Sequence, residues 1–167
     1  MRVPCVVRWP GKVAAGSECV ELATTMDLLP TFAKLAEAAM PKRKIDGHDI
    51  RALLFGEKGA HSPYDAFYYY HLGQLHAVRS GKWKLHLGIA KKSVSLGGNR
   101  KAFEARLYDV GSDVGETRNV AAGHADVVKM LNGYAERARA ELGDDDRKGS
   151  GQRAAGFVDQ PRAQVKR

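Results

Sequence analysis

The residues whose types could support chemistry form small, scattered groups along the chain. His71 and His76 could bind a metal ion as a pair, but a separation of five positions predicts side chains on opposite faces of a strand. The acidic run 144–146 lacks the spacing of a calcium loop and is interpreted as a solvated helix exit. Asp46 and Asp49 lie on either side of a glycine, which favours a turn over acid–base catalysis. These residues therefore predict no metal site and no catalytic pair.

The composition is that of a globular chain with an excess of positive charge. Hydrophobic residues make up 44% and charged residues 28% of the 167 residues, and no run approaches the ~18 apolar residues of a membrane span. The net charge is +8, and residues 147–167 carry six basic side chains against one acidic side chain. The region 144–167 is interpreted as a flexible basic tail, with a role in polyanion binding as the alternative.

An aromatic run over residues 67–70, together with Lys82 and Lys84 around Trp83, could also stack on single-stranded nucleic acid. Strand alternation instead buries part of these aromatic rings against a later helix. No other segment resembles a known nucleic-acid fold, so we expect no nucleic-acid partner.

The amino-terminal region predicts one strand and two helices. Residues 2–9 are apolar and β-branched enough for a buried strand, with Cys5 as a small core residue. Thr24 or Thr25 can cap a helix that Pro41 helps to end. The apolar stripe of this helix comprises Leu28, Leu29, Phe32, Leu35, Ala36 and Ala39. A second, short helix through residues 53–55 ends at Gly56.

The middle of the chain predicts antiparallel strands. They cover residues 66–70, 75–79, 82–87 and 107–110, and a two-residue turn at Ser80-Gly81 joins the second to the third. Alternation places Trp83, Leu85 and Leu87 toward a core and Lys82, Lys84 and His86 on the other face. Residues 89–106 predict a basic, mobile loop, and residues 111–116 predict a turn.

The last predicted element is an amphipathic helix from about His124 to Leu142, which Gly143 ends. Its apolar face comprises Val127, Leu131, Tyr134, Ala138 and Leu142, at intervals of three or four. Strands followed by such a helix predict a small α+β domain in which the sheet packs on the helix.

Five sequence blocks in a fixed order resemble the sulfatase family, of the arylsulfatase type within the alkaline-phosphatase-like superfamily. They are Arg2-Val3-Pro4 with Arg8-Trp9-Pro10-Gly11; Asp27-Leu28-Leu29-Pro30-Thr31; Asp46-Gly47 with Asp49; Ala77-Val78-Arg79 with Gly81-Lys82-Trp83-Lys84-Leu85; and Leu107-Tyr108-Asp109 with Asp113, Gly115-Glu116 and Asn119. The resemblance covers residues 1 to about 142 and is to the carboxy-terminal portion of these enzymes. Val114 departs from it, because a proline is usual there.

The resemblance implies a mixed α/β fold class. Residues 1–56 would be the last strand and helix of the sulfatase α/β domain, and residues 65–143 would be the small carboxy-terminal domain of antiparallel strands and a helix. On this interpretation the chain is a piece of a larger enzyme that is exported to the periplasm or the cell exterior, and its signal peptide lies upstream of Met1.

The resemblance also implies the chemistry of the intact enzyme, which hydrolyses sulfate esters of aryl compounds or carbohydrates. Sulfatases oxidise the first residue of a Cys/Ser-x-Pro-x-Arg motif to formylglycine and bind calcium through Asp and Asn side chains. Neither Cys5 nor Cys19 lies in that motif, and the metal-binding Asp and Asn residues have no counterpart. No catalytic or metal-binding residue can therefore be assigned here, and we expect the chain alone to be inactive.

Small-domain loops of sulfatases can reach over the substrate cleft. His61, His71 and Arg79 lie near predicted hairpin ends and are therefore candidate contacts at the rim of a site for a sulfated small molecule or carbohydrate. The alternative is an ordinary surface role. A non-catalytic polyanion-binding module remains the rival function.

Overall fold

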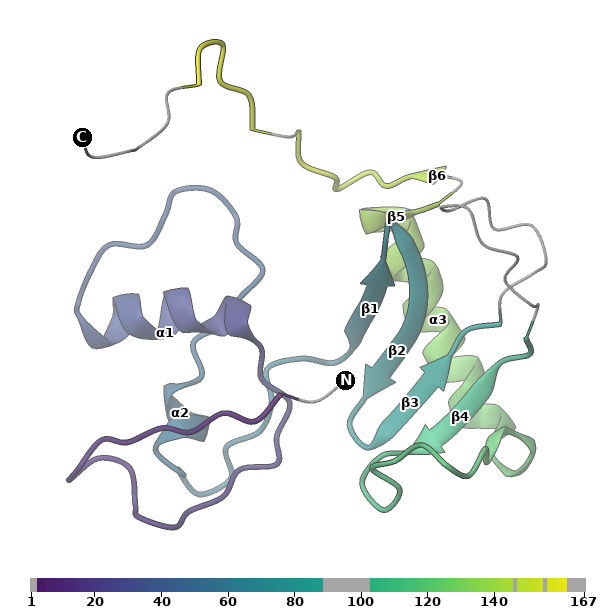
Figure 1. Ribbon diagram of the computed structural model, residues 1–167, viewed down its shortest axis with the longest axis horizontal. Helices are drawn as coiled ribbons and strands as arrows, with labels where there is room; N and C mark the ends of the chain where they lie inside the picture. Colours follow the sequence, from purple (N-terminus) through teal and green to yellow (C-terminus); the bar gives the residue numbers. More distant parts are fainter. Residues whose placement is uncertain (1–2, 89–102, 146, 155, 162–167) are drawn as a thin grey trace. The chain divides into compact units, whose positions relative to one another are not determined.

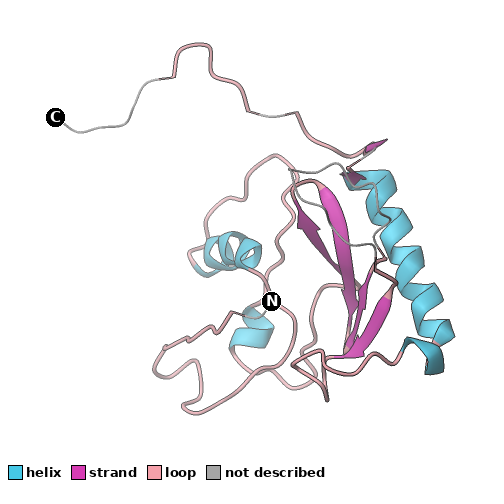
Figure 2. Cartoon of the chain, turned by 45° about the vertical axis from the view of Figure 1, so that its right-hand side comes forward, coloured by secondary structure: helices cyan, strands magenta, loops and turns pink. Residues whose placement is uncertain are grey.

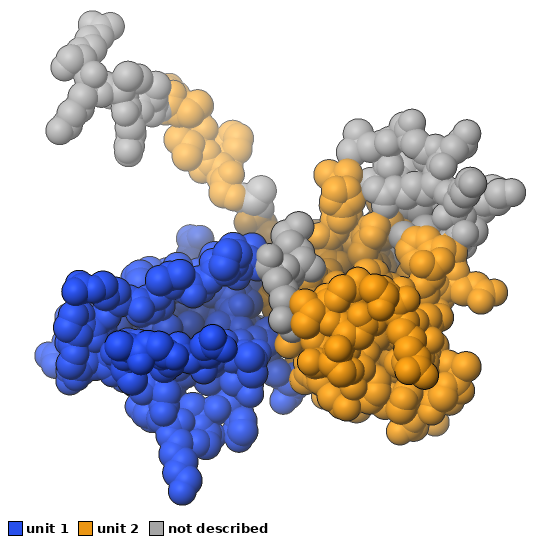
Figure 3. Space-filling view, turned by 60° about the horizontal axis from the view of Figure 1, so that its bottom comes forward, with its two compact units in different colours: residues 1–65 blue, residues 66–167 orange. Residues whose placement is uncertain are grey.

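The computed structural model describes residues 3–88, 103–145, 147–154 and 156–161. The chain divides into two compact units, residues 1–65 (unit 1) and residues 66–167 (unit 2), coloured separately in Figure 3. Helices combine with an antiparallel sheet, which confirms the predicted α/β fold class. The domain limits 1–56, 65–143 and 144–167 stay predictions, and most of the predicted loop 89–106 lies outside the described residues.

Unit 1 contains the 3-10 helix η1 (Thr25–Asp27) and the helices α1 (Leu28–Leu35) and α2 (Arg51–Leu54) (Figure 1). Thr24 caps η1 as predicted, because its side chain accepts the Met26 N–H while the Asp27 side chain accepts the Thr24 N–H. The helix ends earlier than predicted. Glu37 has a φ of 52°, and this left-handed residue turns the chain out of the helix before Pro41.

The buried side of α1 carries Pro30 and Thr31. Leu28, Leu29 and Phe32, which belong to the predicted apolar stripe, are 37%, 55% and 57% exposed. Hydrogen bonds fix this orientation, since the Thr31 hydroxyl accepts the buried Ile50 N–H at 3.0 Å. The side of α1 that faces the rest of unit 1 is thus set by polar contacts.

The strand predicted over residues 2–9 is wrong for the part that the structure describes, because residues 3–9 form no strand. A strand requires a hydrogen-bonded neighbour, and the described residues of unit 1 supply none. Cys5 is exposed rather than part of a core. Trp9, in this segment, has its ring edge-on to Phe55 with 5.8 Å between ring centroids.

Unit 2 is built on a four-stranded antiparallel sheet in the order β1-β2-β3-β4 (Figure 1). The strands are β1 (Phe67–His71), β2 (Gln74–Ser80), β3 (Trp83–His86) and β4 (Arg106–Asp109). Ser80 pairs with Trp83, so the β2–β3 turn consists of Gly81 and Lys82, one residue later than predicted. Gly81 has a φ of 51°, a conformation that glycine adopts without steric cost and that places it inside the turn.

Helix α3 (Ala125–Leu142) covers one face of the sheet, as Figure 2 shows. The core between them contains Leu75, Val78, Leu85, Leu87, Leu107, Leu131, Ala135 and Ala138. The predicted helix face is largely confirmed, with Leu131 fully buried, but Leu142 is 39% exposed and Ala135, which the prediction missed, is buried. No described helix is both long enough and apolar enough to cross a membrane.

After α3, Gly143 ends the helix with a φ of 93°. A small hairpin follows, in which β5 (Gly143–Asp144) pairs with β6 (Arg147–Lys148). The N–H groups of Ser150 and Gly151 then donate to the carbonyls of Ala140 and Glu141, at 2.9 and 2.8 Å. The chain just beyond α3 therefore caps the last carbonyls of that helix.

Candidate functional site

Of the three predicted rim residues, His71 and Arg79 belong to unit 2 and lie apart within it. His61 belongs to unit 1, where its side chain is 80% exposed and its Nδ1 lies 3.9 Å from Glu21 Oε1. His71 and Arg79 lie at opposite ends of the β1–β2 hairpin, because His71 pairs with Gln74 and Arg79 pairs with Phe67. Four residues of strand separate these ends by roughly 13 Å. One small anion cannot contact both side chains.

His71 and His76 lie on neighbouring strands, and their rings meet edge to face with 5.6 Å between centroids. The prediction that they occupy opposite faces is wrong. The chain reverses at the turn between β1 and β2, and a bulge shifts the register between Tyr69 and Tyr70, so counting positions along one strand does not apply.

Three cations lie around the β2–β3 hairpin, and two of them have a carboxylate partner. Lys82 Nζ is 2.8 Å from Asp109 Oδ2, and this hydrogen bond is the main reason why the pKa of Asp109 lies below its ordinary value. Lys84 Nζ is 2.6 Å from Glu116 Oε1. Arg79 instead donates its Nε–H to the carbonyl of Gly81 at 3.0 Å, and no carboxylate of the described residues lies within ion-pair distance of it.

Lys84, Glu116 and His86 form a partly buried cluster in unit 2. Lys84 is only 6% exposed, and its ammonium lies 4.8 Å from the centroid of the Tyr69 ring. The second carboxylate oxygen of Glu116 lies 2.5 Å from His86 Nε2. Burial raises the pKa of Glu116, but the hydrogen bonds from Lys84 and His86 outweigh burial and hold this pKa below its ordinary value.

Sequence reasoning placed Lys84 and His86 on the correct face but missed their partner. The sequence predicts Glu116 only as part of a turn, and its φ of 54° is indeed left-handed. A non-glycine residue held in that conformation costs about 1–2 kcal/mol. The ion pair with Lys84 and the hydrogen bond to His86, both on β3, offset this cost. The only sequence signal for a wider role of Glu116 is that it belongs to the fifth of the blocks that resemble the sulfatase family.

In unit 1 the fully buried Asp27 is the centre of the polar network. One carboxylate oxygen accepts the Thr24 N–H at 2.6 Å, and the other accepts the His48 N–H at 2.8 Å and the Tyr64 hydroxyl. Burial, followed by the bond to Asp27, raises the pKa of Tyr64 to about 12. Asp27 thereby joins α1 to the segment after Asp46 through charge-assisted hydrogen bonds.

Position 47, next to this network, has room only for a glycine. A Cβ at position 47 would lie 1.9 Å from the Met26 carbonyl oxygen, so the backbone around η1 leaves no room for a side chain. The prediction that Asp46-Gly47 serves a turn rather than catalysis is consistent with this close approach. The second and third sequence blocks therefore meet at a backbone-to-backbone contact.

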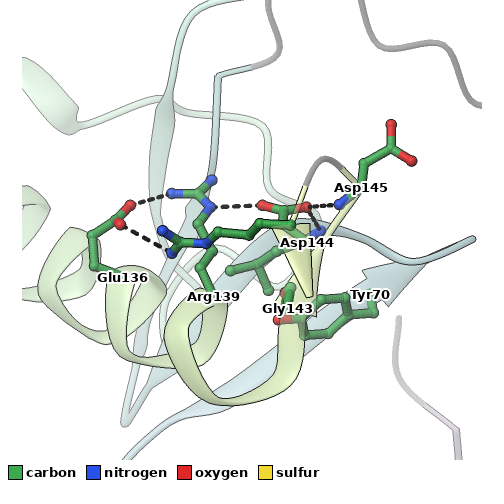
Figure 4. Close-up of polar contacts among 8 residues, drawn as sticks. Tyr70, Glu136, Arg139, Gly143, Asp144 and Asp145 are labelled. Atoms are coloured by element: carbon green, nitrogen blue, oxygen red, sulfur yellow. Dashed lines mark hydrogen bonds and ion pairs between the residues drawn. The ribbon is translucent and has the colours of Figure 1, made fainter. Parts of the chain in front are cut away.

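A third network joins the end of α3 to the sheet, as Figure 4 shows. Asp144 accepts the Leu75 N–H at 2.9 Å and lies 2.7 Å from Arg139 Nε, and Arg139 also pairs with Glu136 (Figure 4). Burial raises the pKa of Asp144, but the bonds from Arg139 and the backbone hold it below its ordinary value. The interpretation of Asp144 as a solvated carboxylate is therefore wrong, because it fastens the helix exit to β2.

A sulfatase metal site would need carboxylate oxygens that are available to a calcium ion, so the partners of the buried carboxylates matter here. The oxygens of Asp27, Glu116 and Asp144 accept protein N–H or O–H groups or pair with cations. Within the described ranges, no three His, Cys, Asp or Glu side chains come together as metal ligands. The described residues do not fit a calcium site, and no catalytic step is assigned to them.

Comparison with known proteins agrees with the fold and the sequence blocks. A family model described as N-sulphoglucosamine sulphohydrolase, C-terminal, matches residues 1–141. Arylsulfatase A of Homo sapiens is 34% identical over 140 residues, which cover 75% of this chain but 27% of that protein. The chain therefore belongs to the sulfatase family and corresponds to its carboxy-terminal region.

Solved structures show the same fold. One is a structure from work on the metabolism of multiple glycosaminoglycans by Bacteroides thetaiotaomicron. It has a TM-score of 0.60 and 24% sequence identity, over 80% of this chain and 28% of that chain. A second, in complex with its substrate D-glucosamine-2-N,6-O-disulfate, has a TM-score of 0.55 and 23% identity, over 79% of this chain and 27% of that one. The chain thus spans about a quarter of the length of these relatives.

Proposed function

We propose that this chain is the carboxy-terminal part of a sulfate-ester hydrolase whose formylglycine and calcium ligands come from residues outside the chain. The intact enzyme removes sulfate from an aryl or carbohydrate ester, and the chain alone is inactive. The observation that carries the proposal is the family match over residues 1–141, combined with the lack of a Cys/Ser-x-Pro-x-Arg motif in this sequence.

Hydrolysis of a sulfate monoester needs an activated oxygen nucleophile and a dense positive field around the sulfate oxygens. The described residues offer the scaffold for such a site rather than the nucleophile. Cys5 and Cys19 are exposed and outside the motif, and the carboxylates of the buried networks already bind partners within the chain. The contribution we assign to this region is structural support and contacts at the substrate rim, with His61, His71 and Arg79 as candidates.

The substrate class that we favour is a sulfated carbohydrate. One structural neighbour was solved with a sulfated glucosamine, which supports this class without extending that substrate to this chain. Aryl sulfates remain useful because they report sulfate-ester hydrolysis irrespective of the sugar.

The test compares two proteins. The first is this chain alone, and the second is the product of the longest open reading frame that contains it, after the DNA upstream of the Met1 codon is sequenced. Both are assayed with an aryl sulfate and calcium. We expect turnover only from the second protein, and only if its frame encodes the Cys/Ser-x-Pro-x-Arg motif. Turnover by the chain alone above a boiled control contradicts the proposal, as does an inactive protein that carries the motif.

A further inference from the structure

The β2–β3 hairpin holds three cations, and Arg79 differs from the other two. Lys82 and Lys84 are each neutralised by a carboxylate at 2.8 and 2.6 Å. Arg79 has no such partner among the described residues, although it is half-buried. The hydrogen bond that its guanidinium makes is exposed to solvent, so an anion can reach this cation directly.

The guanidinium of Arg79 is also oriented by a hydrogen bond to the backbone. Its Nε–H donates to the Gly81 carbonyl across the turn at 3.0 Å, which leaves the four N–H groups of the two terminal nitrogens. Such a planar fork binds two oxygens of a sulfate or phosphate at once, which an ammonium cannot do. Fixing the side chain beforehand reduces the entropy lost when a ligand binds.

The surroundings of Arg79 favour an anion that is attached to an organic group. Phe67 pairs directly with Arg79 in the sheet, and its ring meets the Tyr69 ring edge to face with 5.0 Å between centroids. Both rings are half-buried and lie on the sheet face opposite α3. Apolar surface beside a few oriented polar groups is the usual composition of a small-molecule site.

We propose that Arg79 binds the sulfate group of a sulfated carbohydrate, beside the rings of Phe67 and Tyr69. The choice of sulfate over phosphate rests on the proposed function, since both anions fit the guanidinium. His71 and His76 do not belong to this site, because they lie at the far end of the hairpin. Arg79 is thus a binding residue for the substrate rather than a catalytic one.

The test uses the full 167-residue chain and D-glucosamine-2-N,6-O-disulfate as the ligand, with glucosamine, glucosamine 6-phosphate and sodium sulfate as comparison ligands. Binding is followed by NMR through the Nε–Hε signal of Arg79 and the backbone amides around it. R79Q should weaken binding of the disulfated sugar roughly tenfold or more, as expected for the loss of charge-assisted hydrogen bonds. K82Q removes the same charge from the same hairpin and should change binding less than twofold.

Four results contradict the proposal, either as a whole or in its assignment to sulfate. The first is no shift of the Arg79 signal at ~50 mM ligand, far above the micromolar to millimolar range usual for enzyme substrates. The second is equal weakening by R79Q and K82Q, which indicates unspecific attraction by the basic chain. The third is equal affinity for sodium sulfate and the disulfated sugar, which indicates a site for free anion. Stronger binding of the phosphate sugar contradicts the assignment to sulfate. Backbone amide spectra that match the wild type show that each variant is folded.

Failure here is distinguishable from failure of the proposed function. If Arg79 does not bind the sugar but the longer reading frame hydrolyses aryl sulfate, only the role of Arg79 is wrong. If Arg79 binds the sugar while a longer protein with the motif is inactive, the region is a carbohydrate-binding module and the proposed hydrolysis is wrong.

Discussion

Replacing Asp27 by Asn tests whether a single buried carboxylate holds unit 1 together. The substitution keeps the shape of the side chain but puts an NH₂ group opposite either the Thr24 N–H or the two donors of His48 and Tyr64. At least one hydrogen bond to a charged acceptor is lost, worth about 1.5–3 kcal/mol, and the others become neutral and weaker. Burying a neutral amide costs less than burying a carboxylate, which offsets part of the loss. We expect unit 1 to lose about 2 kcal/mol.

The assay follows Trp9, the one tryptophan of unit 1, in a Trp83→Phe background so that fluorescence reports this unit alone. With a slope of about 1 kcal/mol per molar urea for a small unit, the expected loss lowers the unfolding midpoint by about 2 M. Asp49→Asn is the matched control, since its carboxylate is an exposed partner of Arg51 and should contribute below about 1 kcal/mol.

A second variant separates the bonds of Asp27 from its packing. Tyr64→Phe removes one donor to the carboxylate and should cost about 1 kcal/mol. The combined Asp27→Asn, Tyr64→Phe variant should then be more stable than the sum of the two effects predicts, because Asp27→Asn weakens or removes the same bond that Tyr64→Phe removes. A midpoint for Asp27→Asn that equals the midpoint for Asp49→Asn refutes the reasoning, and strict additivity refutes the direct contact with Tyr64.

Two further predictions concern backbone space and pH. Gly47→Ala should prevent the close approach to Met26, so that unit 1 unfolds at a lower urea concentration. Gly133→Ala, at a position of α3 with open space around it, should instead stabilise unit 2 by about 1 kcal/mol. Equal changes in the stability of the two units would contradict this account. The lowered pKa of Glu116 means that its stabilisation of unit 2 is present above its unfolded pKa and is lost as pH falls through the folded value. Glu116→Gln should therefore cost about 1 kcal/mol at pH 7 and flatten the acid limb of a Trp83-monitored stability profile; an unchanged limb rules this out.

The sequence predicted most of unit 2 because its elements follow from local patterns. Alternation through Trp83 and Leu85 and the helical spacing through Leu131 express which side chains are buried, and burial is the main source of stability. The predicted strand 2–9 failed because strand formation depends on a neighbour that local pattern cannot supply. The prediction that His71 and His76 lie on opposite faces failed for a related reason. A bulge and a hairpin turn bring these two side chains together irrespective of their spacing in the sequence.

The candidate site was less predictable because the polar roles depend on distant partners. Asp27 reaches His48 and Tyr64, and Glu116 reaches Lys84 across 32 positions, so neither role can be inferred from the neighbouring residues. Position near a hairpin end is the sequence feature that predicts the rim residues, and it does not distinguish Arg79 from His71. Only the register and the ion-pair partners separate them.

The sequence blocks that identify the family are chiefly connections within the scaffold. Asp27 joins two segments of unit 1, the Asn119 side chain accepts the Leu107 N–H at 3.0 Å beside β4, and Asp113 accepts the N–H groups of Thr117 and Arg118 at 2.8 Å each. Such residues keep the fold and cannot be released for a ligand without cost. Arg79 comes from the same blocks, yet no described carboxylate balances its charge. A family signature residue that the scaffold leaves without a counter-ion is where contact with an anionic substrate should be sought.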